Sequence, residues 1–181
     1  MPEPDHVWVF GYGSLVWRPS FPYAIRRAAR ITGWMRRFWQ ASTDHRGTVE
    51  HPGRVATLVE APGQIVWGTC YAVAVADWPA VLDALEVREQ QGYDRVEVSA
   101  GLAEGVHAGP ICGEVPAIIY IATPANAHFI GPESLAATAA VVRTAHGPSG
   151  DNVTYVRALA RALHELGAPD PEVDALAALL G

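Results

Sequence analysis

Strand-forming and helix-forming segments are kept largely apart along this chain, and that separation limits the folds available to it. β-branched and aromatic runs bounded by glycine and proline predict about six strands in the first two thirds. Apolar residues at helical spacing predict four helices, three of them in the last third. Because strands and helices do not alternate regularly, the pattern predicts an α+β fold rather than a doubly wound parallel sheet. The expected strands are residues 7–10, 30–40, 55–59, 66–75, 95–99 and 117–121, separated by loops with glycine and proline such as residues 51–53 and 61–63. The expected helices are residues 77–89, 132–144, 151–166 and 171–180.

The length of the chain favours one domain. With 181 residues, of which 50% are hydrophobic and 18% charged, it can bury one sizeable core but is short for two independent ones. Residues 101–116 carry glycine and proline with weak patterning, and we expect them to form a surface excursion inside the domain rather than a linker. The sequence therefore predicts a single domain over residues 1–181.

The charge balance and the absence of long apolar runs exclude several classes of protein. A net charge of −6 argues against nucleic-acid binding, which needs clustered excess lysine and arginine. No apolar run approaches the roughly 20 residues that span a bilayer, and residues 1–6 have neither the basic nor the apolar region of a signal peptide. We therefore expect a cytoplasmic protein that binds neither nucleic acid nor membrane.

The cysteines and histidines give no sign of a metal centre. Cys70 and Cys112 lie far apart, outside any CxxC or Cys/His spacing, and are expected to be small buried hydrophobic residues without a disulfide. The seven histidines form no pair at helical spacing and no HExxH pattern, so no metal is expected.

Glu89 is the acidic residue whose position in the pattern is unusual. At about 100° per residue it falls on the same helix face as the apolar Trp78, Leu82 and Leu85. A carboxylate aimed into an apolar environment has a raised pKa, which suits a general base or acid. The alternative is that the helix, which Asp77 is expected to cap, ends before Glu89 and the side chain turns outward.

A glycine-containing turn follows the first expected strand. Successive backbone N–H groups of Gly11, Tyr12, Gly13 and Ser14 could hold a carboxylate or an oxyanion. The alternative is a structural turn in which Tyr12 and Trp17 pack in the core. The dinucleotide pattern GxGxxG is excluded because Val16 stands where its third glycine is required.

Several polar segments leave two interpretations open. The positive charges of Arg36, Arg37, Arg46 and Arg54 suit an anionic small substrate, but they also suit a solvated strand face. Ser42 and the run Asp44, His45 and Arg46 invite comparison with a catalytic triad, although adjacent residues rarely face one another and a solvated loop is favoured. The turn at residues 147–152 could bind a ligand at a helix start, or simply be capped by Ser149 or Asp151.

Longer motifs add a resemblance to a known family. They are VFGYGSLVW at residues 9–17, RRFWQASTDHRGT at 36–48, PGRVATLVE at 52–60, VWGTCYAV at 66–73, VREQQGYDR at 87–95, FIGPESL at 129–135 and GPSGDNVTYV at 147–156. Together, in this order, they resemble the ChaC family of γ-glutamylcyclotransferases over nearly the whole chain. The chain departs from the family pattern at Gln91, where glycine is usual, and at Asp151, where a basic residue is common.

The resemblance implies a compact mixed β-barrel with flanking helices. It also implies cleavage of glutathione to 5-oxoproline and cysteinylglycine, with Glu89 as acid and base and with no cofactor, metal or required protein partner. The alternatives are a cyclotransferase for other γ-glutamyl amino acids or amines, and a non-catalytic module that binds glutathione or a partner protein. The residues expected to bind substrate are Val9, Phe10, Gly11, Tyr12, Gly13, Ser14, Leu15, Arg54, Tyr93 and Tyr155.

Overall fold

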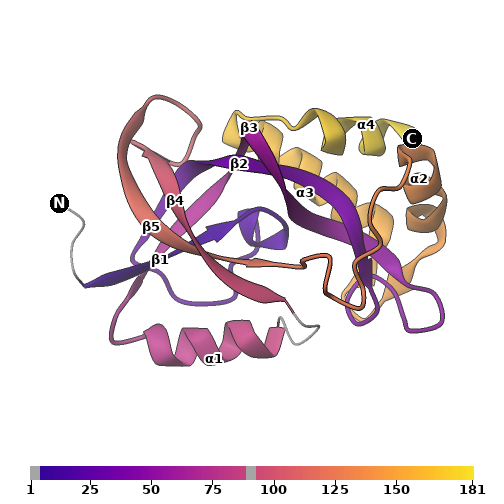
Figure 1. Cartoon of the computed structure of the whole chain (residues 1–181), viewed down its shortest axis with the longest axis horizontal. Coiled ribbons are helices and arrows are strands. Elements are labelled where there is room, and N and C mark those ends of the chain that lie inside the picture. The colour runs from indigo at the N-terminus through magenta and orange to yellow at the C-terminus, as the bar shows by residue number, and fades with distance from the viewer. Residues whose placement is uncertain (1–4, 89–92) are drawn as a thin grey trace.

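A curved sheet occupies one part of the molecule and a group of helices the other (Figure 1). The structure, a computed structural model, describes residues 5–88 and 93–181. In chain order the larger strands are β1 (His6–Gly11), β2 (Ile25–Ser42), β3 (Gly53–Ala74), β4 (Asp94–Ala103) and β5 (Ile111–Ile121). A short 3₁₀ helix, η1 (Ser14–Val16), follows β1.

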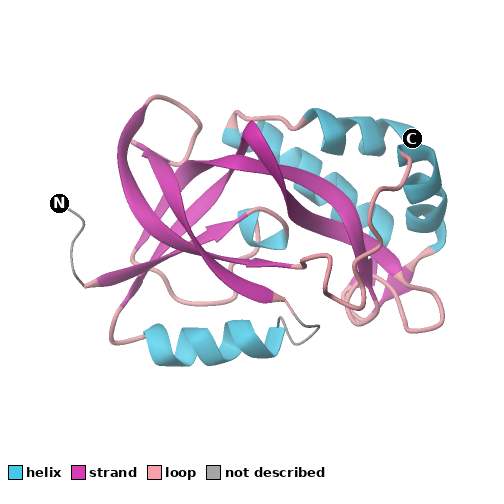
Figure 2. Ribbon diagram, viewed as in Figure 1, coloured by secondary structure: helices cyan, strands magenta, loops and turns pink. Residues whose placement is uncertain are grey.

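The five strands close into a barrel in the order β1-β3-β2-β4-β5 (Figure 2). Closure comes from a parallel pairing of β1 with β5, in which Trp8 faces Ala117 and Val9 faces Ile118. The other pairings are antiparallel. The mixed barrel and the helices beside it confirm the α+β fold expected from the sequence.

The strands are longer than their sequence patterns predicted. The expected strands 55–59 and 66–75 are one continuous β3, because β2 pairs along it from Ile25 opposite Ala72 to Ser42 opposite Gly53. The expectation of a loop at residues 61–63 that separates two strands is therefore wrong, and these residues form an irregularity within β3, where the register with β2 shifts between Glu60 and Ile65. Residues 101–116, expected as a weakly patterned surface excursion, are the end of β4, a loop at residues 104–110 and the start of β5, and the two strands pair as a hairpin.

All four expected helices are present: α1 (Trp78–Arg88), α2 (Leu135–Thr144), α3 (Asn152–Leu166) and α4 (Pro171–Leu180). Figure 1 shows α1 alone below the barrel, whereas α2, α3 and α4 gather at its other end. The expected end of α3 is confirmed, because Gly167 follows it in the left-handed conformation with φ 82°. Two short strands, β6 (His146–Gly147) and β7 (Gly150–Asp151), form the turn between α2 and α3.

Two apolar clusters hold these layers together. The larger one fills the barrel and joins it to the C-terminal helices, with Phe10 and Phe38 from the strands and Leu159 and Leu163 from α3. In the smaller one, Val81 and Leu85 of α1 pack against Val9, Tyr71 and Val73 on the outer side of the barrel. The buried side chains of α1 are thus Val81 and Leu85, whereas the sequence predicted Trp78, Leu82 and Leu85. Leu82 is only half-buried.

The two cysteines differ in exposure. Cys70 is buried as expected, but Cys112 is exposed, so the expectation that both are buried is wrong for Cys112; both are free thiols.

None of the helices within residues 5–88 and 93–181 has the length and apolarity to cross a membrane.

Candidate active site

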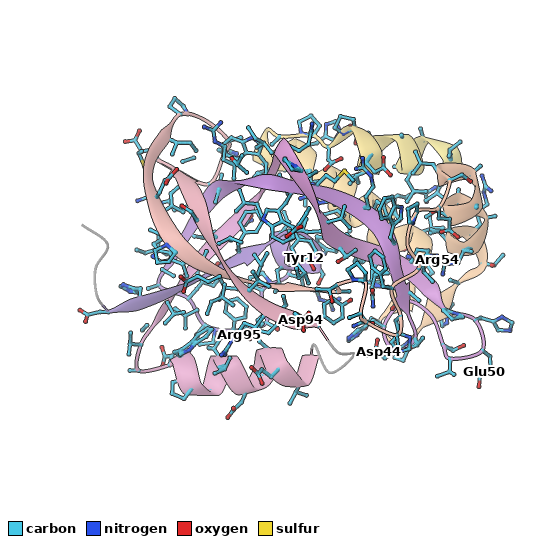
Figure 3. All side chains as sticks on the ribbon, in the orientation of Figure 1. Tyr12, Asp44, Glu50, Arg54, Asp94 and Arg95 are labelled. Atoms are coloured by element: carbon cyan, nitrogen blue, oxygen red, sulfur yellow. The ribbon has the colours of Figure 1, made fainter. Side chains whose placement is uncertain are left out.

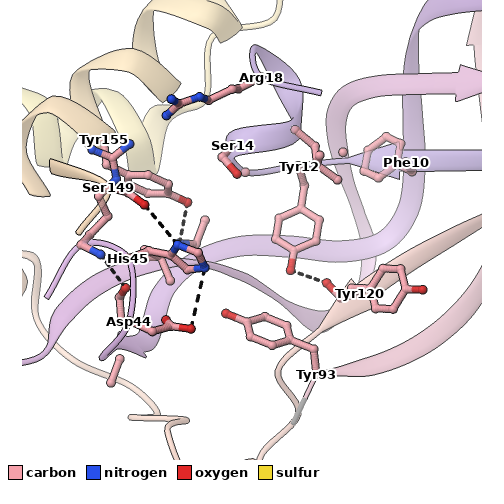
Figure 4. Close-up of a pocket in the computed structure, with 18 residues that line it drawn as sticks. Phe10, Tyr12, Ser14, Arg18, Asp44, His45, Tyr93, Tyr120, Ser149 and Tyr155 are labelled. Atoms are coloured by element: carbon pink, nitrogen blue, oxygen red, sulfur yellow. Dashed lines mark hydrogen bonds and ion pairs between the residues drawn. The ribbon is translucent and has the colours of Figure 1, made fainter. Parts of the chain in front are cut away.

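A cavity of about 130 Å³ lies where the turn after β1 meets the end of β2 and the start of α3 (Figure 4). Its wall comes from elements far apart in the sequence. The lining residues are Phe10, Gly11, Tyr12, Gly13, Ser14, Leu15, Arg18, Ala41, Ser42, Asp44, His45, Arg46, Val55, Ala56, Tyr93, Tyr120, Ser149 and Tyr155.

The turn between β1 and η1 forms one wall of the cavity, and contacts of Leu15 with Gly11 and with Tyr71 hold it in place. A Cβ on Gly11 would lie 2.5 Å from the Cβ of Leu15, so the close approach of these residues requires glycine at position 11. The hydroxyl of Tyr71 donates to the carbonyl oxygen of Leu15 at 2.6 Å. Burial raises the pKa of Tyr71 to about 12, so this hydroxyl remains a donor at neutral pH.

Gly13 lines the cavity. Its N–H takes part in no hydrogen bond within residues 5–88 and 93–181, whereas its carbonyl accepts from Val16 N at 3.0 Å. A Cβ at this position would lie 3.2 Å from the hydroxyl of Tyr155. The absence of a side chain therefore leaves room beside the turn for a ligand group.

Tyrosines form the side of the cavity nearest to β4 and β5. The hydroxyl of Tyr12 donates to the carbonyl oxygen of Tyr120 at 2.5 Å, which joins the turn to β5. Figure 4 places Tyr93 beside this pair, just before β4 begins. Across the cavity, the Tyr155 hydroxyl accepts from Ala56 N at 3.2 Å.

The opposite side is polar and carries positive charge. Arg46 is buried, its Nη1 donates to the carbonyl oxygen of Asp151 at 3.2 Å, and its guanidinium lies over the Tyr155 ring at 5.6 Å from the centroid. His45 Nδ1 lies 3.2 Å from Ser149 Oγ, and His45 Nε2 lies 3.7 Å from Asp44 Oδ2 (Figure 4). Arg18 also lines this side.

Asp44, His45 and Ser149 resemble a catalytic triad in composition but not in geometry. The His45–Asp44 separation exceeds hydrogen-bond distance, and about half of the His45 side chain is exposed. The segment is therefore a cavity wall with partly exposed side chains, not the fully solvated loop that the sequence favoured.

Most of the expected substrate-binding residues are brought together by the fold. Eight of the ten line the cavity: residues 10–15, Tyr93 and Tyr155. Val9 does not, because its side chain packs in the smaller apolar cluster, between the barrel and α1. Arg54 does not either: its Nε donates to Glu133 Oε2 at 3.0 Å, and Figure 3 shows it nearer to the C-terminal helices than Tyr12 is.

The expected catalytic residue, Glu89, lies outside the described residues. It follows α1 directly in the sequence and precedes Tyr93 by four positions. Gln91 lies outside them as well.

The sequence did not single out Tyr120 or Arg18, which carry no local motif. Ser42, Arg46 and Ser149 belong to segments it noticed, and only their proximity in the fold assigns them to the cavity. The alternative of a capped turn at residues 147–152 is confirmed for Asp151, whose carboxylate accepts from Thr154 N at 2.8 Å at the start of α3. Ser149 instead faces the cavity.

Within the described part of the chain, no group of three or more His, Cys, Asp and Glu side chains is arranged to hold a metal ion.

A closed mixed barrel whose first turn lines a partly open cavity with apolar and polar walls defines an α+β protein with a candidate small-molecule site. Comparison with known proteins identifies the family. The profile of ChaC-like proteins matches residues 7–181, and the chain belongs to this family.

Relatives and solved structures agree with this assignment. The chain is 38% identical over 180 residues to human glutathione-specific γ-glutamylcyclotransferase 1, covering 98% of this chain and 78% of the human one. It is 36% identical over 200 residues to the glutathione-specific γ-glutamylcyclotransferase of Saccharomyces cerevisiae, covering 88% and 86% of the two chains. A crystal structure of a yeast γ-glutamylcyclotransferase specific to glutathione superposes with a TM-score of 0.89 at 33% identity, over 97% of this chain and 96% of the other.

Proposed function

We propose that this protein is a glutathione-specific γ-glutamylcyclotransferase, which converts glutathione to 5-oxoproline and cysteinylglycine. One observation carries the proposal: eight of the ten residues expected to bind the substrate surround a single cavity, in a chain that matches glutathione-specific relatives over most of its length. We further propose that residues 1–181 form one domain that acts in the cytoplasm on this small molecule, without a cofactor or a required protein partner.

The size of the cavity suits one end of the substrate. A volume of about 130 Å³ is close to the ~150 Å³ that accommodates a benzene ring. The γ-glutamyl group, which becomes a five-membered ring in the product, fits such a space. The cavity is partly open, so the cysteinylglycine part lies along its open side, which Arg18 and Arg46 also line.

The reaction needs a base because the attacking group is an amine. At neutral pH the α-amino group of glutathione is mostly protonated and cannot attack. In the proposed mechanism the ammonium group first releases one proton to solvent, and the neutral amine nitrogen bonds to the γ-carbonyl carbon while Glu89 removes a second proton from it. Glu89 then gives this proton to the cysteinyl nitrogen as its bond to that carbon breaks, and the departing amine regains the first proton from solvent, so that atoms and charge balance.

The turn of residues 11–15 is assigned the binding of the γ-glutamyl group. The Gly13 N–H donates to an oxygen of the substrate, and Tyr12 and Tyr93 lie beside the site of ring closure. General acid and base catalysis contributes roughly 10²- to 10⁴-fold to such a reaction. Folding the γ-glutamyl chain into its near-attack shape supplies much of the rest.

The experiment measures both products from reduced glutathione by mass spectrometry, for the wild type and for Glu89→Gln. The amide is close in shape to the carboxylate but cannot accept the proton, so we expect stoichiometric 5-oxoproline and cysteinylglycine from the wild type and none from the variant. The matched control is Glu86→Gln, an exposed residue of α1 that pairs with Arg95 at 3.6 Å and should retain activity.

Other γ-glutamyl amino acids and amines are assayed in parallel. Turnover of these compounds but not of glutathione would assign the chain a different leaving group. Binding of glutathione without turnover by folded wild-type protein would favour a non-catalytic module.

A further inference from the structure

Arg46 is a buried cation without a carboxylate partner among the described residues. It is only 7% exposed, yet the hydrogen bond it donates from its side chain goes to a neutral acceptor, the Asp151 carbonyl. The face of the guanidinium is covered by the Tyr155 ring. A guanidinium carries several N–H donors in one plane, so most of its capacity to bind an anion remains unused.

Arg18 adds a second positive charge on the same wall of the cavity. Burial lowers the pKa of Arg46, and among its charged neighbours Arg18 acts in the same direction, so the two guanidinium groups repel each other in the described structure. An anion bound at this wall would relieve both effects, because it would pair with two cations at once.

The acidic side chains nearby are engaged elsewhere. The carboxylate of Asp151 accepts from the backbone N and from Oγ1 of Thr154, as the cap of α3. The carboxylate of Asp44 lies 3.7 Å from His45 Nε2. Among the described residues neither forms an ion pair with Arg18 or Arg46, although Asp151 attracts Arg46 at longer range and so acts to raise the pKa of Arg46. The N–H donors of this wall therefore remain available to a ligand.

The cavity has two distinct ends (Figure 4). Tyr12, Tyr93 and Tyr120 lie toward one end, while Arg18, Tyr155 and His45 lie toward the other. The proposed mechanism places ring closure beside Tyr12 and Tyr93, at the tyrosine end of the cavity. The end with the arginines then faces the part of the substrate that does not react.

We propose that Arg46 and Arg18 form a carboxylate subsite that binds the glycine carboxylate of glutathione; this rests on the proposed function. Two extended residues span ~7 Å, so the cysteinyl and glycine units reach from the scissile bond across a cavity of this size. A carboxylate there accepts paired hydrogen bonds from Arg46, and Arg18 completes the charge neutralisation from the rim.

The subsite would explain selection for glutathione. A γ-glutamyl amine has no second carboxylate, and a γ-glutamyl amino acid carries it one residue closer to the scissile bond. Neither can satisfy the buried Arg46 while its γ-carbonyl lies at the tyrosine end, so both bind less well.

The test compares glutathione with glutathione amide, in which the glycine carboxylate is a neutral primary amide. kcat/KM is measured for both with the wild type, Arg18→Gln and Arg46→Lys, with melting temperature as the check on folding. Arg161→Gln is the matched control, since Arg161 is exposed on α3 and pairs with Glu165 away from the cavity.

We expect the wild type to prefer glutathione to its amide roughly tenfold or more. Arg18→Gln should reduce this preference roughly threefold, a modest effect because the side chain is exposed. The loss should appear in KM for glutathione and leave the amide nearly unchanged. Arg46→Lys keeps the charge but not the paired geometry, and should reduce the preference as well. Arg161→Gln should keep the wild-type ratio.

Equal use of the two substrates by the wild type would overturn the proposal. So would an equal loss for both substrates in Arg18→Gln, which is the signature of a purely structural role. Failure of the proposed function is a different result, with no 5-oxoproline from either substrate. In that case the ratio of dissociation constants for the two compounds, measured by calorimetry, tests the subsite on the same variants.

Discussion

The Nε of Arg36 donates to the carbonyl oxygen of Tyr12 at 2.9 Å, so a buried side chain of β2 fixes the turn that lines the cavity. The carbonyl of Tyr12 and the N–H of Gly13 belong to one trans peptide and point in opposite directions. Holding the carbonyl on Arg36 therefore turns the Gly13 N–H away from it. Arg36 is itself held by the Trp67 carbonyl at 2.7 Å and by Asp170 at 2.5 Å.

Asp170→Ala tests how much this arrangement contributes to stability. The substitution leaves the buried Arg36 without its anion and removes the N-cap of α4, so we expect a loss of about 3 kcal/mol in the free energy of unfolding. Asp170→Asn retains Oδ1, which accepts from Glu172 N at 2.9 Å, and should cost less. Urea denaturation measures both.

The control is the neighbouring pair of Arg37 and Glu172, whose atoms are 3.8 Å apart and partly exposed. Glu172→Ala should change stability by about 0.5 kcal/mol or less. Equal losses for Asp170→Ala and Glu172→Ala would show that the buried pair has no special role.

Gly13→Ala tests the space beside the turn. The added Cβ would lie 3.2 Å from the Tyr155 hydroxyl, inside the cavity. We expect a folded protein whose KM for glutathione rises roughly tenfold, as for the loss of a well-placed substrate contact. Steady-state kinetics and a melting curve measure this.

Two other glycines give the comparison. Gly11→Ala brings its Cβ to 2.5 Å from the Leu15 Cβ and should destabilise the fold by about 1–3 kcal/mol. A Cβ added at Gly105 would have no atom of the described residues within 4 Å, so Gly105→Ala should leave stability and KM unchanged. An unchanged KM in Gly13→Ala would remove the turn from the substrate site.

Local signals in the sequence predicted the helices well and the strands less well. The cap Asp151 and the stop Gly167 act within a few residues of the helix they bound, so α3 could be placed from the sequence. Residues 61–63 looked like a loop because glycine and proline dominate there locally. Pairing with β2 on both sides of them, at Glu60 and at Ile65, keeps them within one long strand as an irregularity, and no local pattern contains that pairing.

The site shows the same division between local and long-range information. The turn at residues 11–15 is a local motif and was recognised. The Tyr12–Tyr120 hydrogen bond joins positions 108 apart, and Arg46 approaches Asp151 across 105 positions. Arg36 was grouped with the other arginines, either as charge for an anionic substrate or as part of a solvated strand face. Only the fold shows that it is buried and holds the turn instead.

Asn152→Asp tests the hydrogen bonds that hold the start of α3 against β3. The Asn152 side chain accepts from Arg54 N at 2.7 Å and donates to Arg54 O at 2.9 Å, while the residue is fully buried. Aspartate loses the donor and places a charge beside a carbonyl oxygen, so we expect a loss of about 3 kcal/mol. Thermal and urea unfolding should agree on this value.

The adjacent substitution Asp151→Asn is the matched control, because the amide oxygen can still accept from Thr154 N at the exposed helix start. Its effect should stay within about 0.5 kcal/mol. If Asn152→Asp were equally mild, the two hydrogen bonds to Arg54 would not hold the helix on the sheet.

The ion pair of Arg54 and Glu133 predicts how stability depends on pH. Burial by itself would raise the pKa of Glu133, but the hydrogen bonds from Arg54 and Thr138 outweigh it and lower the pKa below the ordinary 4.5. The folded protein therefore binds fewer protons at Glu133 than the unfolded chain does. The stability from this carboxylate is fully present above pH 4.5 and is lost as the pH falls through the lower folded value.

The measurement is urea unfolding of the wild type and Glu133→Gln at several pH values between 7 and about 3. The wild type should be the more stable at pH 7, and its advantage should shrink in the acid range, because a protonated Glu133 resembles the amide. Glu50→Gln, at an exposed loop position, should parallel the wild type throughout. A gap between wild type and Glu133→Gln that stayed constant down to pH 3 would mean that the pair adds no pH-dependent stability, since only the charged carboxylate distinguishes the two proteins.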